Sequence, residues 1–196
     1  MSAPDQPQDL HPNHTRLIES CSSFLSEVEN LYVHAPLLSF PLTSSSTPGT
    51  ELETRLNTAY GPSSHHFQNF SSIIRHALSA DEPWFANIQI SGPDYRRSRI
   101  AAPSEATKFF SITAVYFNSQ EEFRGQFHKH PYGEINCVIP ITEGAELMGP
   151  NGWQGPGWTS PGPGSEHFPM SRGGEVVSLF FLPAGRIAYV EAPKEE

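Results

Sequence analysis

The second half of the chain consists of short segments rich in β-branched and aromatic residues, with turn-forming residues between them. This pattern begins after Pro83 and constrains the fold more than any other feature. The segments are WFANIQI, FFSITAVYF, EINCVIPI, AELMG, EVVSLFFL and RIAYV. Gly- and Pro-containing turns separate them, among them the run 155–164. Many short strands at such spacing indicate an antiparallel sandwich or barrel, so residues 81–196 are predicted to form one β-barrel domain.

Residues 1–80 carry a helical pattern instead and are predicted to form an N-terminal extension with mobile first residues. Between residues 15 and 33, apolar side chains recur every three or four positions, which indicates an amphipathic helix. These side chains are Leu17, Ile18, Cys21, Phe24, Leu25, Val28, Leu31 and Tyr32. The segments 51–60 and 67–80 show the same pattern, and a Ser/Thr/Pro-rich connector spans 39–50. The chain is therefore expected to be an α+β protein.

The charge balance limits the partners that this chain can bind. Its net charge of −9 arises from 12 Lys and Arg against 21 Asp and Glu. Such an acidic chain is poorly suited to the phosphate backbone of nucleic acids, so no nucleic-acid partner is expected. No apolar run approaches the roughly 20 residues that cross a membrane, and the polar first residues do not resemble a signal peptide. A cytoplasmic location without membrane contact is the default prediction.

The two cysteines, Cys21 and Cys137, lie far apart in sequence and form no CxxC pattern. One disulfide between them is an alternative. Cys137 lies in an apolar run, however, and is better interpreted as a small buried hydrophobic residue.

The sequence FHKHPYGEIN, residues 127–136, has the residue types of half a metal site. His128 and His130 are two residues apart, so on a strand their imidazoles face the same side. The Pro-Tyr-Gly sequence that follows can turn the chain, which would return Glu134 beside them. His167, after the turn-forming sequence PGPGSE, is the candidate fourth ligand. Imidazole and carboxylate ligands suit one divalent Fe, Mn, Ni, Cu or Zn ion, and the pattern does not choose among them.

These segments resemble the two cupin motifs, which are His-x-His followed by Glu, and a Pro/Gly-rich turn followed by Gly-x-x-His. The first is HKHPYGE at 128–134 and the second is GSEH at 164–167. Two positions depart from the pattern, because Gly125 is closer to the histidines than usual and Ser171 replaces a frequent Asn. The resemblance implies a cupin barrel, a double-stranded β-helix or jelly roll, with the N-terminal helices packed on it. It also implies one set of metal ligands, namely His128, His130, Glu134 and His167. Open barrel edges and amphipathic helices favour a homodimer.

A narrower resemblance covers Arg124 to Val190 and includes GAELMGPNGWQG and LFFLPAGRI. This segment is similar to the family of 4-hydroxylaminobenzoate lyases, cupin-like proteins that turn an aromatic hydroxylamine into a catechol and release ammonia. The resemblance implies a metal-dependent enzyme that acts on a small aromatic compound. The same ligands would also serve a non-haem metal dioxygenase of an aromatic or secondary metabolite, which would consume O₂. A cupin that binds a small molecule without chemistry is the third alternative.

Two residues are candidates for moving protons near the metal. Tyr132 lies beside the ligands, although it could equally be a turn aromatic that caps the barrel. Glu146 could point inward as a general base, although a solvated strand residue explains it as well. His65 and His66 could suggest a second metal site, but a Ser-rich helix start also accounts for them.

An aromatic substrate needs an apolar slot, and five aromatic residues are candidates to line it. They are Trp158, Phe110, Tyr116, Phe127 and Phe180, and core packing explains each of them taken singly. Arg186 is a candidate anchor for an anion, with pairing to an acidic neighbour as its alternative. Four further basic residues could hold a carboxylate, since Arg pairs with it bidentately, or could belong to an exposed loop. These are Arg96, Arg97, Arg99 and Lys108.

Overall fold

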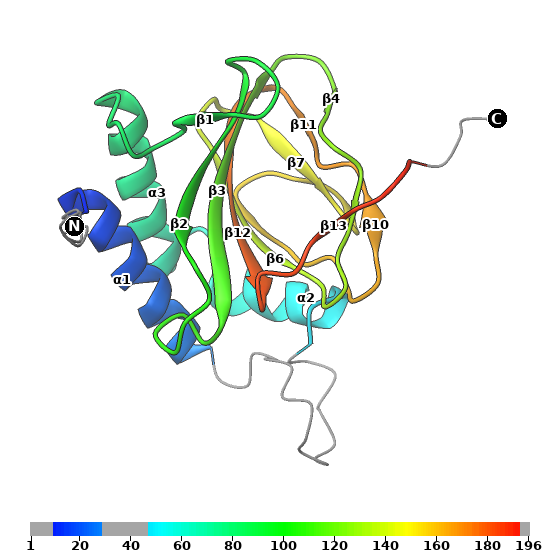
Figure 1. Ribbon diagram of the computed structural model, residues 1–196, viewed down its shortest axis with the longest axis horizontal. Helices are drawn as coiled ribbons and strands as arrows, with labels where there is room; N and C mark the ends of the chain where they lie inside the picture. Colours follow the sequence, from blue (N-terminus) through cyan, green and yellow to red (C-terminus); the bar gives the residue numbers. More distant parts are fainter. Residues whose placement is uncertain (1–9, 29–46, 193–196) are drawn as a thin grey trace, which may run out of the picture.

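The computed structural model describes residues 10–28 and 47–192 and shows three helices followed by antiparallel β-structure (Figure 1). The helices are α1 (Pro12–Glu27), α2 (Thr50–Ala59) and α3 (His65–Ser79). The strands are β1 (Ile88–Gln89), β2 (Tyr95–Ala101), β3 (Phe110–Ser119), β4 (Phe123–Arg124), β5 (His128–Lys129), β6 (Ile135–Pro140), β7 (Glu146–Gly149), β8 (Gly152–Gln154), β9 (Gly157–Thr159), β10 (Glu166–His167), β11 (Met170–Arg172), β12 (Gly174–Pro183) and β13 (Ala188–Tyr189). The α+β prediction is confirmed.

The three helices form where the apolar pattern predicts them. Pro12 occupies the first turn of α1, where its missing N–H leaves no hydrogen bond unmade. The Ser64 side chain caps α3 by accepting a hydrogen bond from the backbone of that helix.

Parts of the predicted N-terminal region lie outside the described residues. These parts are the first nine residues, Leu31, Tyr32 and the connector up to residue 46. None of the helices in the described ranges is long and apolar enough to cross a bilayer.

The strands form three antiparallel sheets. The largest has the order β1-β2-β3-β12-β6-β9, and β3 and β12, each ten residues long, pair along their whole length. A four-stranded sheet has the order β4-β11-β7-β8, and a three-stranded sheet has the order β10-β5-β13. The smaller sheets face the large one across the barrel, while α1 and α3 cover its outer side (Figure 1).

The large sheet is apolar on both faces. On the outer face, Ile112, Leu179 and Phe181 join side chains of the helices in one core. Trp158 is fully buried in this core and stacks on Phe24 with ring centroids 4.8 Å apart. A second cluster fills part of the inner face. The helices and the sheet therefore share one hydrophobic core, and a division into domains at residue 80 stays a prediction.

Two segments differ from their expected structure. DYRRSR, for which an exposed loop is one alternative, lies largely in β2 of the large sheet. The WFANIQI segment contributes only the short strand β1, because Trp84 packs against α1 and stacks on His14 at 4.8 Å. Cys21 and Cys137 are both buried and free, so the alternative of a disulfide is wrong.

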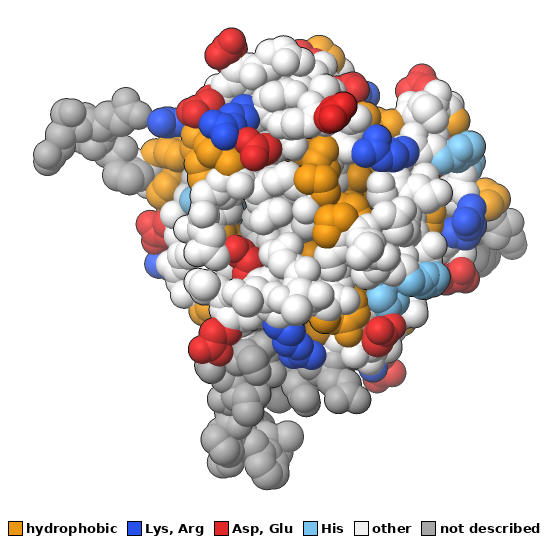
Figure 2. Space-filling view, turned by 180° about the vertical axis from the view of Figure 1, so that it is seen from behind, with side chains coloured by type: hydrophobic (Ala, Val, Ile, Leu, Met, Phe, Trp, Pro, Cys, Tyr) orange, Lys and Arg blue, Asp and Glu red, His pale blue; other side chains and the backbone are white. Residues whose placement is uncertain are grey.

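The surface seen from behind carries acidic and basic side chains interspersed with small apolar patches (Figure 2). Scattered apolar side chains are normal on a protein surface. The homodimer stays a prediction.

Glu82 ties the start of α1 to the end of α3. It is 8% exposed and accepts hydrogen bonds of 2.6 Å from Asn13 Nδ2 and from Trp84 Nε1. His11 and His76 lie 3.5 and 3.4 Å from its carboxylate oxygens. Burial alone would raise the pKa of Glu82, but the hydrogen bonds and the two imidazoles outweigh it and lower the pKa below 4.5.

Glu82→Gln is expected to lower the free energy of unfolding at pH 7 by about 1–2 kcal/mol, because it weakens charge-assisted hydrogen bonds to buried donors. Since the pKa is lowered in the folded state, this stability is present above pH 4.5 and is lost as the pH falls through the folded-state pKa. Urea unfolding at several pH values checks this, with the exposed Glu121→Gln as control. A difference between wild type and variant that stays constant down to pH 3 would contradict the role of the charge.

Candidate metal centre

Three histidines converge at one end of the barrel. His128 lies in β5 and is paired across the strands with His167 of β10, while His130 follows β5 directly. The Nε2 atom of His130 lies 3.0 Å from Nε2 of His128 and 3.0 Å from Nε2 of His167. One nitrogen from each of the three residues lies within 4.8 Å of the others. His167 therefore lies beside His128 and His130, as the sequence predicted.

The turn after β9 holds His130 in place. The backbone N–H of His130 donates to the carbonyl of Ser165, and its carbonyl accepts from Gly164 at 2.7 Å. Gly133 closes a second turn, directly after His130, with a φ of +78°, and a Cβ there would lie 2.4 Å from Pro48 and 2.8 Å from the carbonyl oxygen of Pro161. The Gly and Pro residues of both motifs therefore position the imidazoles through backbone contacts.

Hydrogen bonding fixes the direction in which His128 presents its lone pair. Its Nδ1 lies 2.8 Å from the carbonyl oxygen of Gln126, so Nδ1 carries the hydrogen and Nε2 is free to act as a ligand. Burial lowers the pKa of His128, lowers that of His130 to about 2 and lowers that of His167 to about 4. All three imidazoles are therefore neutral at pH 7, which is the form that binds metals.

Glu134 contacts His130 on the side away from this cluster. The side chain is 2% exposed, and its Oε2 lies 3.5 Å from Nδ1 of His130. Burial raises the pKa of Glu134 to about 8. The histidine cluster does not include this carboxylate. Glu134 therefore lies beside His130 Nδ1 without a hydrogen bond to it, and its role as a direct ligand stays a prediction.

The donor set fits a divalent ion. Two nitrogens that each lie about 2.0–2.1 Å from one ion are separated by about 3 Å, and the two measured Nε2 separations are 3.0 Å. His130 Nδ1 and Glu134 Oε1 are buried without a hydrogen-bond partner. Buried polar atoms of this kind are costly unless a charge or a partner compensates them. A cation bound at the three Nε2 atoms would favour the ionised form of Glu134, whose carboxylate lies on the Nδ1 side of His130.

A cavity of about 120 Å³ opens beside His128 and Glu134. Strands of the large sheet and the C-terminal segment form its walls. Its apolar lining consists of Ile90, Val115, Pro169, Phe180, Leu182 and Ile187, and its other lining residues are Tyr95, Arg97, Thr113, Gln126, His128, Glu134 and Tyr189. An apolar cavity with a few convergent polar groups is typical of a small-molecule site.

The predicted aromatic residues are distributed over both faces of the sheet. Phe180 lines the cavity. Trp158, Phe110 and Tyr116 belong to the core between the sheet and the helices, because Thr113 and Val115 occupy the inward positions of β3. Phe127 packs on Phe168 with ring centroids 4.8 Å apart and is not among the cavity residues.

Four of the predicted polar residues are not among the residues that line the cavity. The Glu146 carboxylate accepts hydrogen bonds of 2.9 and 2.8 Å from Nε and Nη2 of Arg172, so it is engaged outside the cavity. Tyr132 is half-buried in the turn after His130, and Arg186 is exposed after β12. Lys108 is exposed in the turn before β3.

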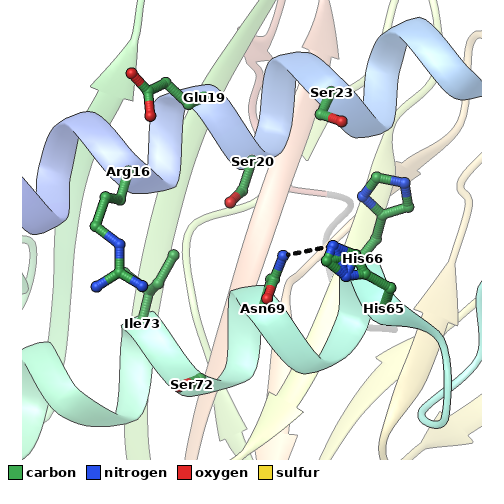
Figure 3. Close-up of a pocket in the computed structure, with 9 residues that line it drawn as sticks. All are labelled: Arg16, Glu19, Ser20, Ser23, His65, His66, Asn69, Ser72 and Ile73. Atoms are coloured by element: carbon green, nitrogen blue, oxygen red, sulfur yellow. Dashed lines mark hydrogen bonds between the residues drawn. The ribbon is translucent and has the colours of Figure 1, made fainter.

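The second histidine pair lies far from this centre, in a polar groove between α1 and α3 (Figure 3). His66 Nε2 lies 2.5 Å from Glu27 Oε2, and His65 Nε2 lies 3.1 Å from the Asn69 side-chain nitrogen. Within residues 10–28 and 47–192, the one group with metal-binding geometry is the cluster of His128, His130 and His167. The helix-start interpretation therefore accounts for His65 and His66.

Sequence reasoning missed most residues of the cavity wall, among them Tyr95, Gln126 and Tyr189. Tyr189 pairs with His128 across β13 and β5, and their ring centroids are 6.2 Å apart. A two-residue strand near the C-terminus gives little periodic signal. Tyr95 could have been found from its position two residues before Arg97, which puts both on one face of a strand.

An antiparallel barrel that gathers His-x-His, a following Glu and a distant His at one end has the fold and site of a cupin-like protein. Two solved structures are similar at low level. They are a DMSP lyase from Ruegeria pomeroyi DSS-3 (14% identity, TM-score 0.45, 95% of this chain and 100% of that chain) and an RmlC-like cupin from Ralstonia eutropha JMP134 (15% identity, TM-score 0.42, 57% and 69%).

Residues 40–189 match the 4-hydroxylaminobenzoate lyase family. A 4-hydroxylaminobenzoate lyase from Nocardioides sp. (strain LMS-CY) is 46% identical over 97% of this chain and 98% of its own length. Another of the same name from Pseudomonas putida is 45% identical over 88% of this chain and 93% of its own length. The chain belongs to the 4-hydroxylaminobenzoate lyase family, and the similarity extends well beyond the segment from Arg124 to Val190.

Proposed function

We propose that this enzyme converts 4-hydroxylaminobenzoate and water into 3,4-dihydroxybenzoate and ammonia. The observation that carries the proposal is the identity of 46% and 45% to two proteins named for this activity, over nearly the whole chain. The cavity supports it, because apolar walls suit one aromatic ring and the polar groups suit its two substituents.

The reaction balances without an external oxidant, since the N–O bond of the substrate is itself the oxidising group. That bond breaks and its oxygen leaves as water, while a water molecule adds to the ring carbon next to the nitrogen-bearing carbon. Hydrolysis of the resulting carbon–nitrogen double bond releases ammonia and leaves a carbonyl. Loss of the ring proton then restores the aromatic catechol, and the net change consumes one water and releases one ammonia.

His128, His130 and His167 are the residues proposed to hold a divalent ion, and the carboxylate of Glu134 lies behind His130. Such an ion, when bound, supplies Lewis acidity toward the hydroxylamine oxygen. Burial raises the pKa of Tyr95 to about 12, so its Oη keeps its proton at neutral pH and is a hydrogen-bond donor at the cavity wall. Tyr132 stays a candidate for proton transfer.

An anaerobic assay tests the proposed reaction. Purified protein and 4-hydroxylaminobenzoate should yield ammonia and 3,4-dihydroxybenzoate in equal amounts, at the same rate with and without O₂. 4-Aminobenzoate, which lacks the N–O bond, should release no ammonia. A product that forms only in the presence of O₂ would support the dioxygenase alternative, and absence of any product with the metal-loaded protein would contradict the proposal.

A further inference from the structure

Among the residues that the structure describes, Arg97 is the one Lys or Arg side chain that lines the cavity beside His128 and Glu134. It lies in β2, directly opposite Val115 of β3, and Val115 also lines the cavity. Tyr95, two residues earlier on the same strand, faces the same space. The barrel therefore places a permanent positive charge on the cavity wall formed by the large sheet.

The guanidinium of Arg97 has an unused buried donor. Its Nε atom is buried and has no hydrogen-bond partner. The neighbouring Arg96 points to the opposite face, where Nη1 donates to the carbonyl of Ala86 at 3.4 Å and the guanidinium lies 4.6 Å from the centroid of the Tyr116 ring. A buried, unpaired guanidinium donor is costly, and an anion entering the cavity would satisfy it.

We propose that Arg97 binds the carboxylate of the substrate and makes the enzyme specific for benzoate-type aromatic hydroxylamines. This inference rests on the proposed function and names the residue that recognises the substrate. Guanidinium and carboxylate pair through two parallel hydrogen bonds, which fix orientation as well as position. In 4-hydroxylaminobenzoate the carboxylate and the hydroxylamine lie at opposite ends of the ring. When Arg97 holds the carboxylate, the hydroxylamine points away from β2, and Val115 and Phe180 lie beside the ring.

The test compares two substrates in four proteins: wild type, Arg97→Gln, Arg97→Lys and Arg99→Gln. Arg99 is the matched control, because it is an exposed arginine of the same strand. With 4-hydroxylaminobenzoate, Arg97→Gln should lose about 30- to 1,000-fold in kcat/KM, as expected for truncating one partner of a buried charge pair. Arg97→Lys should retain part of the activity. With N-phenylhydroxylamine, which lacks the carboxylate, Arg97→Gln and wild type should be equal.

Binding of benzoate, measured by calorimetry, separates this inference from the proposed function. Wild type and Arg99→Gln should bind benzoate, Arg97→Gln should bind it at least tenfold more weakly, and benzamide should not distinguish the proteins. This pattern would support the role of Arg97 even if wild type failed to turn over 4-hydroxylaminobenzoate. Equal losses with both substrates, or benzoate binding unchanged in Arg97→Gln, would overturn the assignment.

Discussion

Replacing His130 with alanine is expected to abolish turnover, with a loss of at least about 10³-fold in kcat. His130 is fully buried, and its Nε2 lies 3.0 Å from the Nε2 atoms of both other histidines, so it is the centre of the cluster. Without it, two imidazoles on β5 and β10 remain, which is too few to hold an ion in fixed geometry. The variant should therefore lose bound metal together with activity.

Two controls distinguish this result from misfolding. His130→Gln keeps a polar side chain of similar size and should also lose metal, while far-ultraviolet circular dichroism stays that of wild type. His65→Ala removes an exposed histidine from the groove between α1 and α3 and should keep both metal and activity. Unchanged turnover in His130→Ala would contradict a catalytic metal at this cluster. Loss of metal in His65→Ala would indicate that the metal binds between α1 and α3 instead.

Replacing Trp158 with alanine is expected to lower the free energy of unfolding by about 3–5 kcal/mol. Its indole is fully buried, stacks on Phe24 at 4.8 Å, and donates from Nε1 to the carbonyl of Tyr60 at 2.7 Å. The substitution leaves a cavity between α1 and the sheet and removes the hydrogen bond to the Tyr60 carbonyl. A domain of ordinary stability has only about 5–15 kcal/mol in total. For a chain of this size each kcal/mol corresponds to about 2–4 °C, so the melting temperature should fall by about 6–20 °C.

The Trp158 experiment also separates a packing role from a substrate contact. Trp158→Phe keeps an aromatic ring in the core and should leave KM unchanged while stability falls by a smaller amount. Trp153, which is half-buried under the guanidinium of Arg172 at 4.1 Å, is the control, and Trp153→Ala should cost about 1 kcal/mol or less. A raised KM in Trp158→Phe with an unchanged melting temperature would support substrate contact instead.

The fold was predictable where periodicity is strong. The helical patterns of 15–33 and 67–80 correspond to α1 and α3, and the β-branched and aromatic segments FFSITAVYF and EVVSLFFL correspond to β3 and β12. The strand of Tyr95–Ala101 was harder to foresee, because three arginines in seven residues suggest exposure. Its pairing with β3, the ten-residue strand that follows it in the chain, makes it a strand of the large sheet.

The candidate site was predictable as a set of residues but not as a geometry. The sequence shows His128 and His130 in one motif and His167 in another, but not the distance between the two motifs. In the structure the three side chains lie together. The strands of the large sheet are apolar on both faces, so their sequences do not indicate which face lines the cavity. Trp158 and Tyr116, which were predicted to line it, lie on the face that the helices cover. The pairing of Glu146 with Arg172 depends on the register between β7 and β11, which no sequence spacing specifies.

Activity as a function of bound metal tests the central claim most directly. The protein would be purified without a histidine tag, stripped with a chelator, and reloaded with increasing amounts of Fe, Mn, Ni, Cu or Zn while ammonia release from 4-hydroxylaminobenzoate is followed. We expect activity to be absent in the stripped protein, to rise linearly with at least one of these ions and to saturate at one ion per chain. Full activity in protein that elemental analysis shows to be free of metal would contradict this expectation.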